Sequence, residues 1–306
     1  EIAMYCVIDI GSNTIRLVIY RVEDNAIKPM LNNKVAAGLA GYVDKNRNLR
    51  PAGIEKAVSV LKEFRQVLDM LPECEVFPFA TASLRNIDNT DEVLSAIRSE
   101  CGLEVRVLSG KEEALYDYHG AVRAMQSKTG LLTDIGGGST ELVFYQNGMA
   151  RVAESVPVGS LNLYDRFVEE LLPQNKECRK MEKEVRQLLE KTVPSKGAYA
   201  AQPMCAVGGT ARSTLELFRS LSGADASSYD RQFLNRILVM LEENPKKLIR
   251  RILKVAPDRV HTLIPGILIL KTVAETYGSQ SIVTSPYGVR EGYLSDILEQ
   301  RGILHG

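Results

Sequence analysis

The sequence predicts an α/β protein made of two similar domains with mixed sheets. A motif near the start, DIGSNTIRLVIY at residues 9–20, returns as DIGGGSTELVFY at residues 134–145, with six of twelve positions identical. Around each copy, β-branched apolar runs alternate with segments of helical periodicity, which is typical of α/β domains. The length of 306 residues exceeds one ordinary core and suits two domains.

The composition indicates which kinds of partner and which cellular compartment to expect. Hydrophobic residues make up 45% of the chain and charged residues 25%, as in globular proteins. Lys plus Arg and Asp plus Glu both total 38, so no bulk field attracts nucleic acid or an anionic membrane, and we expect neither as a partner. The five cysteines lie far apart without a CxxC pair, which favours a reducing, cytoplasmic location. No signal peptide or membrane span is predicted.

The first half predicts a hairpin followed by alternating helices and strands. Residues 4–10 and 15–22 are apolar strands joined by the turn GSNT. A glycine-bearing connection leads to a helix over about 53–70, whose apolar residues follow helical spacing. Residues 75–85, EVFPFATASLR, predict a strand that ends in a loop of small residues.

Three further elements complete this half. A helix is predicted over about 90–100 and a strand within 103–110. The stretch 109–125, SGKEEALYDYHGAVRAM, predicts a helix with Ser109 as N-cap and acidic residues in its first turn.

The second half repeats the plan. Its predicted elements are a hairpin (130–151), a strand (154–160), a charged helix (175–192), a strand–glycine turn–helix unit (204–214), helices (230–277), and a last strand, loop and C-terminal helix (280–298).

The predicted domains are residues 1–112 with 292–306, and residues 113–291. The C-terminal helix follows its loop so closely that we expect it to return to the first domain. No low-complexity linker separates the halves, so they are expected to pack around a central cleft.

The two repeated loops have the composition of phosphate-binding loops. Small residues let backbone N–H groups converge on an anion, and hydroxyl groups add donors. The predicted phosphate contacts are Gly11, Ser12, Asn13, Thr14, Gly136, Gly137, Gly138, Ser139 and Thr140. Each copy alone fits an ordinary hairpin turn, but two copies in register, both beginning with Asp, favour phosphate binding. Asp9 and Asp134, at the strand ends, are candidates to hold a divalent cation.

A third glycine loop, AVGGTARST at residues 206–214, matches neither Walker A nor the dinucleotide fingerprint. Gly208, Gly209 and Thr210 would let a ligand approach a helix N-terminus. A tight strand-to-helix turn explains them equally well.

Glu112 and Glu113 are the candidate carboxylates for proton transfer. Adjacent helix residues point about 100° apart, so at most one of them aims at a shared site. Both also fit a structural role as first-turn acids that favour the helix dipole.

The ordered set of motifs VIDIGSNTIRLVIY, FATASLRN, VLSGKEEA, DIGGGSTELV, VGGTARST and IPGILIL…YGVREG resembles the exopolyphosphatase and guanosine-pentaphosphate phosphohydrolase family, from about residue 4 to residue 298. The resemblance implies the duplicated ribonuclease-H-like architecture of actin, the sugar kinases and the large chaperone ATPases. It implies hydrolysis of terminal phosphates from polyphosphate or guanosine pentaphosphate with Mg²⁺ or Mn²⁺.

The resemblance also implies roles for single residues. Glu113 would be the general base, and Arg85, in TASLRN, would bind substrate phosphate. Asp134 and Glu141 stand seven positions apart across a predicted hairpin turn, so both could face the loop mouth. By the resemblance they would serve the metal, with Asp9 helping through water, although Glu141 also fits a solvated strand residue.

Other cations are candidates by their position in the sequence. Arg16, Lys111 and Arg290 adjoin these loops, yet each alone fits a surface charge. The basic segment 244–259 would either guide a polyphosphate chain or be a solvated helix face, and the solvated face is favoured. The three histidines lack metal-ligand spacing.

The chain departs from the family at VAAG, residues 35–38, where members commonly have an arginine; the loss near Ala36 puts one phosphate contact in doubt. The sequence also stops without the long helical C-terminal part of larger members, which makes processive action on long chains a weaker expectation than terminal hydrolysis.

Two alternatives to the hydrolase remain from the sequence. One is a non-catalytic sensor of polyphosphate or alarmone, and the other is an ATP-using kinase or ATPase of the same architecture. A homodimer is left open.

Overall fold

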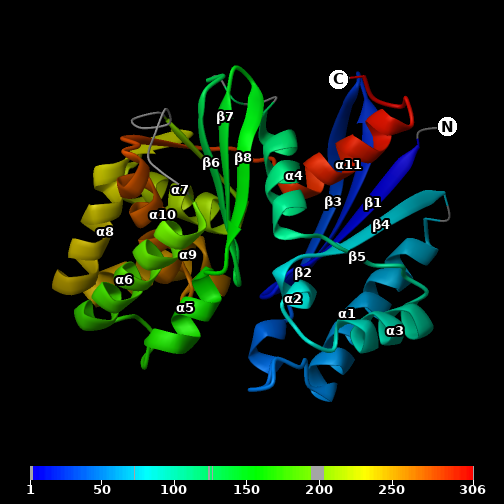
Figure 1. Cartoon of the computed structure of the whole chain (residues 1–306), viewed down its shortest axis with the longest axis horizontal. Helices are drawn as coiled ribbons and strands as arrows, with labels where there is room; N and C mark the ends of the chain where they lie inside the picture. The colour runs from blue at the N-terminus through cyan, green and yellow to red at the C-terminus, as the bar shows by residue number, and fades with distance from the viewer. Residues whose placement is uncertain (1–2, 72, 123–124, 126, 194–202, 306) are drawn as a thin grey trace. The chain divides into compact units, whose positions relative to one another are not determined.

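The computed structural model describes residues 3–71, 73–122, 125, 127–193 and 203–305 (Figure 1). Contacts within the chain divide it into two units, Glu1–Glu113 with Arg290–Gly306 and Ala114–Val289. The predicted domain bounds differ from these units at Glu113, Arg290 and Glu291. The units are described separately below.

The first unit contains a mixed five-stranded sheet in the order β3-β2-β1-β4-β5. Its strands are β1 (Met4–Ile10), β2 (Thr14–Glu23), β3 (Ala26–Ala36), β4 (Cys74–Ala80) and β5 (Arg106–Val107). Strands β1, β2 and β3 form an antiparallel meander, and β4 and β5 continue the sheet parallel to β1.

One face of this sheet carries the first core. Alternate residues of β1, namely Cys6, Ile8 and Ile10, are fully buried there. The face is covered by α1 (Pro51–Asp69) and α3 (Thr90–Cys101), which bury their apolar stripes against it. The short helices η1 (Leu39–Tyr42) and α2 (Ala82–Arg85) lie at the strand ends.

The second unit repeats this sheet and extends it by one strand, in the order β10-β11-β9-β6-β7-β8. Its strands are β6 (Gly130–Ile135), β7 (Thr140–Gln146), β8 (Met149–Val156), β9 (Met204–Val207), β10 (Ser228–Asp230) and β11 (Ser281–Thr284). The meander β6-β7-β8 corresponds to β1-β2-β3, and β9 and β11 run parallel to β6 as β4 and β5 run parallel to β1. The predicted duplication is therefore present in the strand topology.

Helices of the second unit surround the larger core. They are α5 (Ser160–Phe167), α6 (Asn175–Thr192), α7 (Gly208–Ser222), α8 (Arg231–Glu243), α9 (Pro245–Val255), η2 (Pro257–Arg259) and α10 (Leu263–Tyr277). Helix α10, from the apolar run TLIPGILIL, is buried on nearly all sides and packs against α5, α6, α7 and α8. In the described part of the chain, no helix combines the length and apolarity needed to cross a bilayer.

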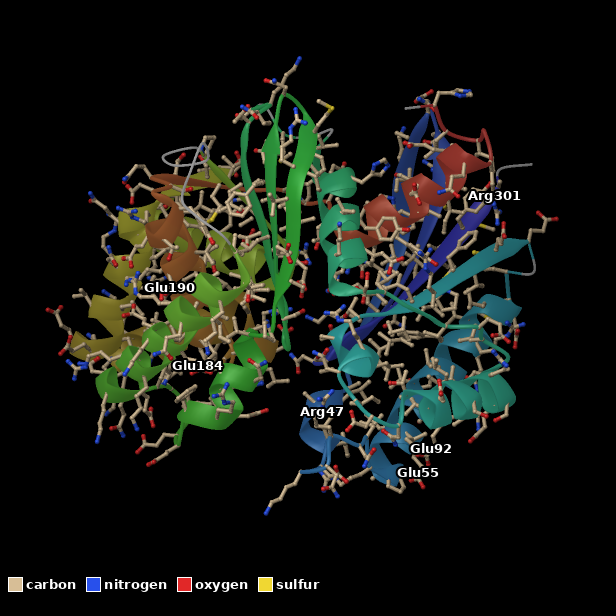
Figure 2. All side chains as sticks on the ribbon, viewed as in Figure 1. Arg47, Glu55, Glu92, Glu184, Glu190 and Arg301 are labelled. Carbon is tan, nitrogen blue, oxygen red and sulfur yellow. The ribbon has the colours of Figure 1, made fainter. Side chains whose placement is uncertain are left out.

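Two helices lie at the unit boundaries. Helix α4 (Gly110–Val122) begins in the first unit, and its Ala114, Tyr118 and Ala121 pack on the second unit's sheet. Helix α11 (Val289–Gln300) follows β11 but packs on the first unit, the return predicted for it. The Tyr20 hydroxyl donates to Glu291 at 2.6 Å, and Arg301, labelled in Figure 2, pairs with Glu75 at 2.7 Å.

Strand β3 was not predicted from the sequence. Most of its side chains are exposed, so no apolar alternation marks this edge strand. Its register shifts by one residue at Met30, beside Pro29, which has no N–H for the ladder.

Other elements also differ from the prediction. The small-residue loop after β4 is helix α2, and the strand expected within 103–110 contains two residues. Helix α5, which was not predicted, occupies eight residues after β8. The helix expected over 109–125 ends at Val122, and residues 123–124 lie outside the described residues.

Gly53, in the first turn of α1, is required by packing. A Cβ there would lie 2.6 Å from the Cβ of Tyr42 and 2.7 Å from Cδ1 of Leu49. Gly53→Ala should lower the free energy of unfolding by about 1–3 kcal/mol in urea titration, because it overpacks the site. Helix propensity alone predicts a gain of about 1 kcal/mol. Gly41→Ala is the control, because its Cβ would meet nothing within 4 Å; an unchanged or increased stability of Gly53→Ala would contradict the packing account.

Candidate functional site

The two repeated loops adopt the same turn at the ends of β1 and β6. The Gly11 N–H donates to the Thr14 carbonyl at 3.0 Å, and the Gly136 N–H donates to the Ser139 carbonyl at 2.9 Å. The donors and the acceptors are both 125 positions apart, as in the sequence repeat. The sequence therefore duplicates a defined backbone turn.

The loop after β6 is held by the start of α5. Backbone N–H groups of Ser160 and Leu161 donate to the carbonyls of Gly136 and Gly137 at 2.8 and 3.0 Å. The approach needs Gly159, whose Cβ would lie 2.4 Å from the Gly137 carbonyl carbon. With its carbonyls engaged, the loop keeps the N–H groups of Gly137 and Gly138 without an acceptor in the described part of the chain. Two such N–H groups form an anion-binding concavity.

The loop after β1 is held in the same way. The Ala40 N–H, in η1, donates to the Ser12 carbonyl at 3.0 Å, and the Gly38 N–H donates to the Asn13 carbonyl at 2.9 Å. The N–H groups of Ser12 and Asn13 bond to no acceptor among residues 3–71, 73–122, 125, 127–193 and 203–305. Ala36, where the family commonly has an arginine, pairs with Thr14 across β2 and β3, so that position adjoins this loop.

The third glycine loop proves to be one member of a second repeated pair. The Thr210 hydroxyl, at the start of α7, donates to the Ile135 carbonyl at 3.0 Å. The Ser83 hydroxyl, in α2, donates to the Ile10 carbonyl, its counterpart in β1. The segment GGTAR thus occupies the place of TASLR, and Arg212 corresponds to Arg85.

Two of the predicted phosphate donors are already engaged. The buried hydroxyls of Thr140 and Thr210 donate to the carbonyls of Val158 and Ile135, at 2.6 and 3.0 Å. Their side chains fix the loops, and any contact with phosphate stays a prediction.

Asp134 and Glu141 face each other directly across β6 and β7. Directly opposed residues of an antiparallel pair lie on one face of the sheet, as predicted for this pair. Glu141 is fully buried and accepts a hydrogen bond from the Ser155 hydroxyl at 2.7 Å, so the solvated alternative is wrong.

The start of α7 adds two close contacts to this pair. Gly208 has φ +80° and lies so near Asp134 that a Cβ would come within 2.0 Å of the Asp134 Oδ1. The Arg259 guanidinium lies against Gly209, whose Cβ would come within 1.9 Å of the Arg259 Nη2. Burial lowers the pKa of Arg259, whereas Asp258 and Asp134 act to raise it, which places its charge near Asp134.

The corresponding positions of the first unit carry a different charge pattern. Asp9 corresponds to Asp134, but Arg16 lies opposite it on β2, in the place of Glu141. Asp9 Oδ2 accepts a hydrogen bond from Arg290 at 2.9 Å. Burial acts to lower the pKa of Arg290, but the charges of Asp9 and Glu291 outweigh it and raise the pKa. Asp9 thus has a cationic partner within its own unit, and its predicted metal role stays a prediction.

The two glutamates at the start of α4 have different partners. Glu112 accepts from the Ser109 N–H at 2.8 Å and pairs with Arg106 at 2.6 Å; the Ser109 N–H, chiefly, lowers the Glu112 pKa. Glu113 is buried and pairs with Arg85 at 2.7 Å. Glu112 therefore caps the helix, whereas Glu113 is held against the predicted phosphate ligand.

A divalent cation fits Asp134 and Glu141 by the chemistry of the donors. Two opposed carboxylates repel each other, and hard cations such as Mg²⁺ prefer carboxylate oxygens. Within the described residues, no cluster of three or more His, Cys, Asp or Glu side chains is arranged to hold a metal. A cation here would therefore need oxygens from water or a phosphate as well, which is how Mg²⁺ is commonly bound.

The structure thus groups most predicted residues into sets within each unit. In the second unit, one set lies at the end of β6: Gly136–Ser139, Asp134, Glu141, Gly208 and Gly209. In the first unit, the corresponding set lies at the end of β1: Gly11–Thr14, Asp9, Arg16 and Arg290. Arg85 and Glu113 form a separate pair in the first unit. Lys111 is exposed on α4. Arg259 was not singled out from the sequence, because nothing in the basic segment 244–259 distinguishes it from its neighbours.

The chain resembles known proteins over nearly its whole length. The sequence model of the Ppx/GppA phosphatase family matches residues 18–301. Proteins named exopolyphosphatase 1 from Mycobacterium bovis and Mycobacterium tuberculosis are each 25% identical over 305 residues, covering 94% of this chain and 86% of theirs.

Solved structures agree in fold. A Ppx/GppA family member from Aquifex aeolicus superimposes with a TM-score of 0.81 at 25% identity, covering all of both chains. An exopolyphosphatase from Cytophaga hutchinsonii superimposes with a TM-score of 0.84 at 23% identity, covering 97% of this chain and 98% of that one. The predicted fold of two mixed-sheet, actin-like ATPase domains is confirmed. With a family match that covers nearly the whole sequence, the chain belongs to the Ppx/GppA phosphatase family.

Proposed function

We propose that the protein releases terminal orthophosphate from inorganic polyphosphate, guanosine pentaphosphate or both, with Mg²⁺ or Mn²⁺ and Glu113 as general base. Family membership supports phosphohydrolase activity. The names of the mycobacterial relatives favour polyphosphate as a substrate.

The observation that carries the proposal is the end of β6. Asp134 and Glu141 pair across β6 and β7, and the turn between these strands carries the N–H groups of Gly137 and Gly138. A set of N–H donors alone suits any anion, and a carboxylate pair alone suits a cation. Together they suit a phosphate that arrives with a divalent cation. Arg259, against Gly209, adds a guanidinium whose geometry matches phosphate oxygens.

In this mechanism Glu113 is the proton acceptor, and its ion pair with Arg85 determines when the carboxylate is available. While Arg85 donates to Glu113, that carboxylate oxygen is poorly placed to take a proton from water. A phosphate oxygen competes for Arg85, because guanidinium groups bind phosphate as readily as carboxylate. When Arg85 turns to the phosphate, Glu113 is released to orient the attacking water and accept its proton.

The remaining chemistry is electrostatic. In phosphoryl transfer the enzyme mainly positions the reactants and neutralises charge on the phosphoryl oxygens. Asp134 and Glu141 would hold the divalent cation, which when bound neutralises part of that charge. Gly137, Gly138 and Arg259 bind and orient the phosphate.

Glu113→Gln tests the base. The substitution keeps the size of the side chain and removes its ability to accept a proton. We expect orthophosphate release to fall by about 10²–10⁴-fold with Mg²⁺, for both tripolyphosphate and guanosine pentaphosphate. Glu112→Gln, the neighbouring control, should retain most activity because Glu112 caps the helix.

The outcomes separate the alternatives. Near-normal turnover by Glu113→Gln would remove Glu113 from the mechanism. Binding by the wild type without phosphate release from either substrate would favour the sensor, and transfer from ATP to an acceptor would favour the kinase.

Gly208→Ala tests the metal pair. The added Cβ collides with the Asp134 carboxylate and would displace it. The concentration of Mg²⁺ that gives half-maximal activity should therefore rise by about tenfold or more. Gly223→Ala is the matched control: it has φ +73° but its Cβ would meet nothing within 4 Å. Both variants should lose about 1–3 kcal/mol of stability from the positive φ. An equal Mg²⁺ requirement in the two variants would separate Asp134 from the metal.

A further inference from the structure

We propose that the outer face of α9 binds the extended part of a long inorganic polyphosphate chain and leads it towards the start of α7. This inference rests on the proposed function and adds a binding surface outside the site described above. The surface, called the α9 row, consists of Lys247, Arg250, Arg251 and Lys254, with Lys246 beside it.

The charge of α9 is of one sign. Its eleven residues, PKKLIRRILKV, include five cations and no carboxylate. Leu248 and Ile252 are buried and fix the inner face of the helix. Residues 247, 250, 251 and 254 are three or four positions apart, so they share the opposite face.

Most cations of the α9 row have no acidic partner. Within the part of the chain that the structure describes, no ion pair links Lys246, Lys247, Arg250 or Lys254 to a carboxylate. Elsewhere in the same unit some exposed cations do pair, as Arg166 does with Glu184 and Arg186 with Glu275. Four unpaired like charges on one short helix repel each other, and a polyanion would relieve that repulsion.

Two contacts with α7 fix the direction of the α9 row relative to the glycine loop at the start of α7. Arg251 lies beside Ser220, near the end of α7, with its Nη1 3.4 Å from the hydroxyl oxygen. Arg259, four residues after α9, lies against Gly209 at the start of α7. The chain from Arg251 to Arg259 therefore runs antiparallel to α7, and the α9 row ends towards the loop that adjoins Asp134.

Helix α6 shows what an ordinary solvated face looks like in this unit. It also carries exposed Lys176, Arg179 and Lys183, but acidic residues alternate with them. Two of these, Glu184 and Glu190, are labelled in Figure 2. A helix face that mixes acidic and basic residues attracts a polyanion less than a face with cations alone. Removing three cations from α6 is therefore a control that changes the net charge by the same amount.

The α9 row should matter only for substrates long enough to reach it. Tripolyphosphate that occupies the terminal-phosphate site has no phosphates left for α9. A long chain has many, and each contact adds a small electrostatic gain. The expected signature is therefore a dependence of KM, but not of kcat, on chain length.

The experiment compares two triple variants of the full chain. The first replaces the α9 cations, Lys247→Gln, Arg250→Gln and Lys254→Gln, and the second replaces the α6 cations, Lys176→Gln, Arg179→Gln and Lys183→Gln. Phosphate release is measured with long polyphosphate and with tripolyphosphate. The α9 variant should raise KM for long polyphosphate roughly tenfold at low salt, with unchanged kcat and unchanged KM for tripolyphosphate. The α6 variant should match the wild type.

Each other outcome is decisive. Equal KM values for long polyphosphate in the α9 variant and the wild type would overturn the inference while leaving the hydrolase intact. A similar rise in the α6 variant, or for tripolyphosphate, would also overturn it, because the effect would then be general. If the wild type releases phosphate from neither substrate, the polyphosphate part of the proposed function fails, and calorimetric binding of long polyphosphate to the same variants decides the α9 row separately.

Discussion

The last carbonyl of each central strand, Ile10 in β1 and Ile135 in β6, fixes the groups that the proposed reaction uses. Each carbonyl accepts a hydrogen bond from a hydroxyl group just after the neighbouring parallel strand. The donor is Ser83, after β4, in the first unit and Thr210, after β9, in the second. This hydrogen bond holds two loops, distant in sequence, at one strand end. Because buried carbonyls need partners, the same contact satisfies the backbone and positions the site.

The two copies of this arrangement have diverged in charge while keeping their backbone. Opposite the strand-end aspartate stands Arg16 in the first unit and Glu141 in the second. In the first unit the strand-end carboxylate lies beside two guanidinium groups, whereas in the second unit two carboxylates face each other near Arg259. This difference across the hairpin is the reason that we propose the divalent metal for the second unit.

The sequence predicted the fold class, the doubled loop and the facing of Asp134 and Glu141, because those features lie in local patterns and in register. It could not identify β3, whose exposed edge lacks alternation, or α5, which is short. The equivalence of GGTAR and TASLR was hidden because only one of the two segments contains glycine. Arg259 was hidden because its proximity to Gly209 depends on how η2 packs against α7, and nothing local encodes that contact.

The partly buried ion pair between Arg85 and Glu113 is central to the proposed mechanism, because substrate must displace the carboxylate from Arg85. The direct test is the affinity of wild type and Glu113→Gln for imidotriphosphate, an analogue that resists hydrolysis, by calorimetry. If Glu113 competes with phosphate for Arg85, removing its charge should tighten binding by about tenfold or more, since a hydrogen bond to a charged group contributes about 1.5–3 kcal/mol. Unchanged or weaker binding would show that Arg85 does not pass from the carboxylate to the phosphate, and would contradict the account.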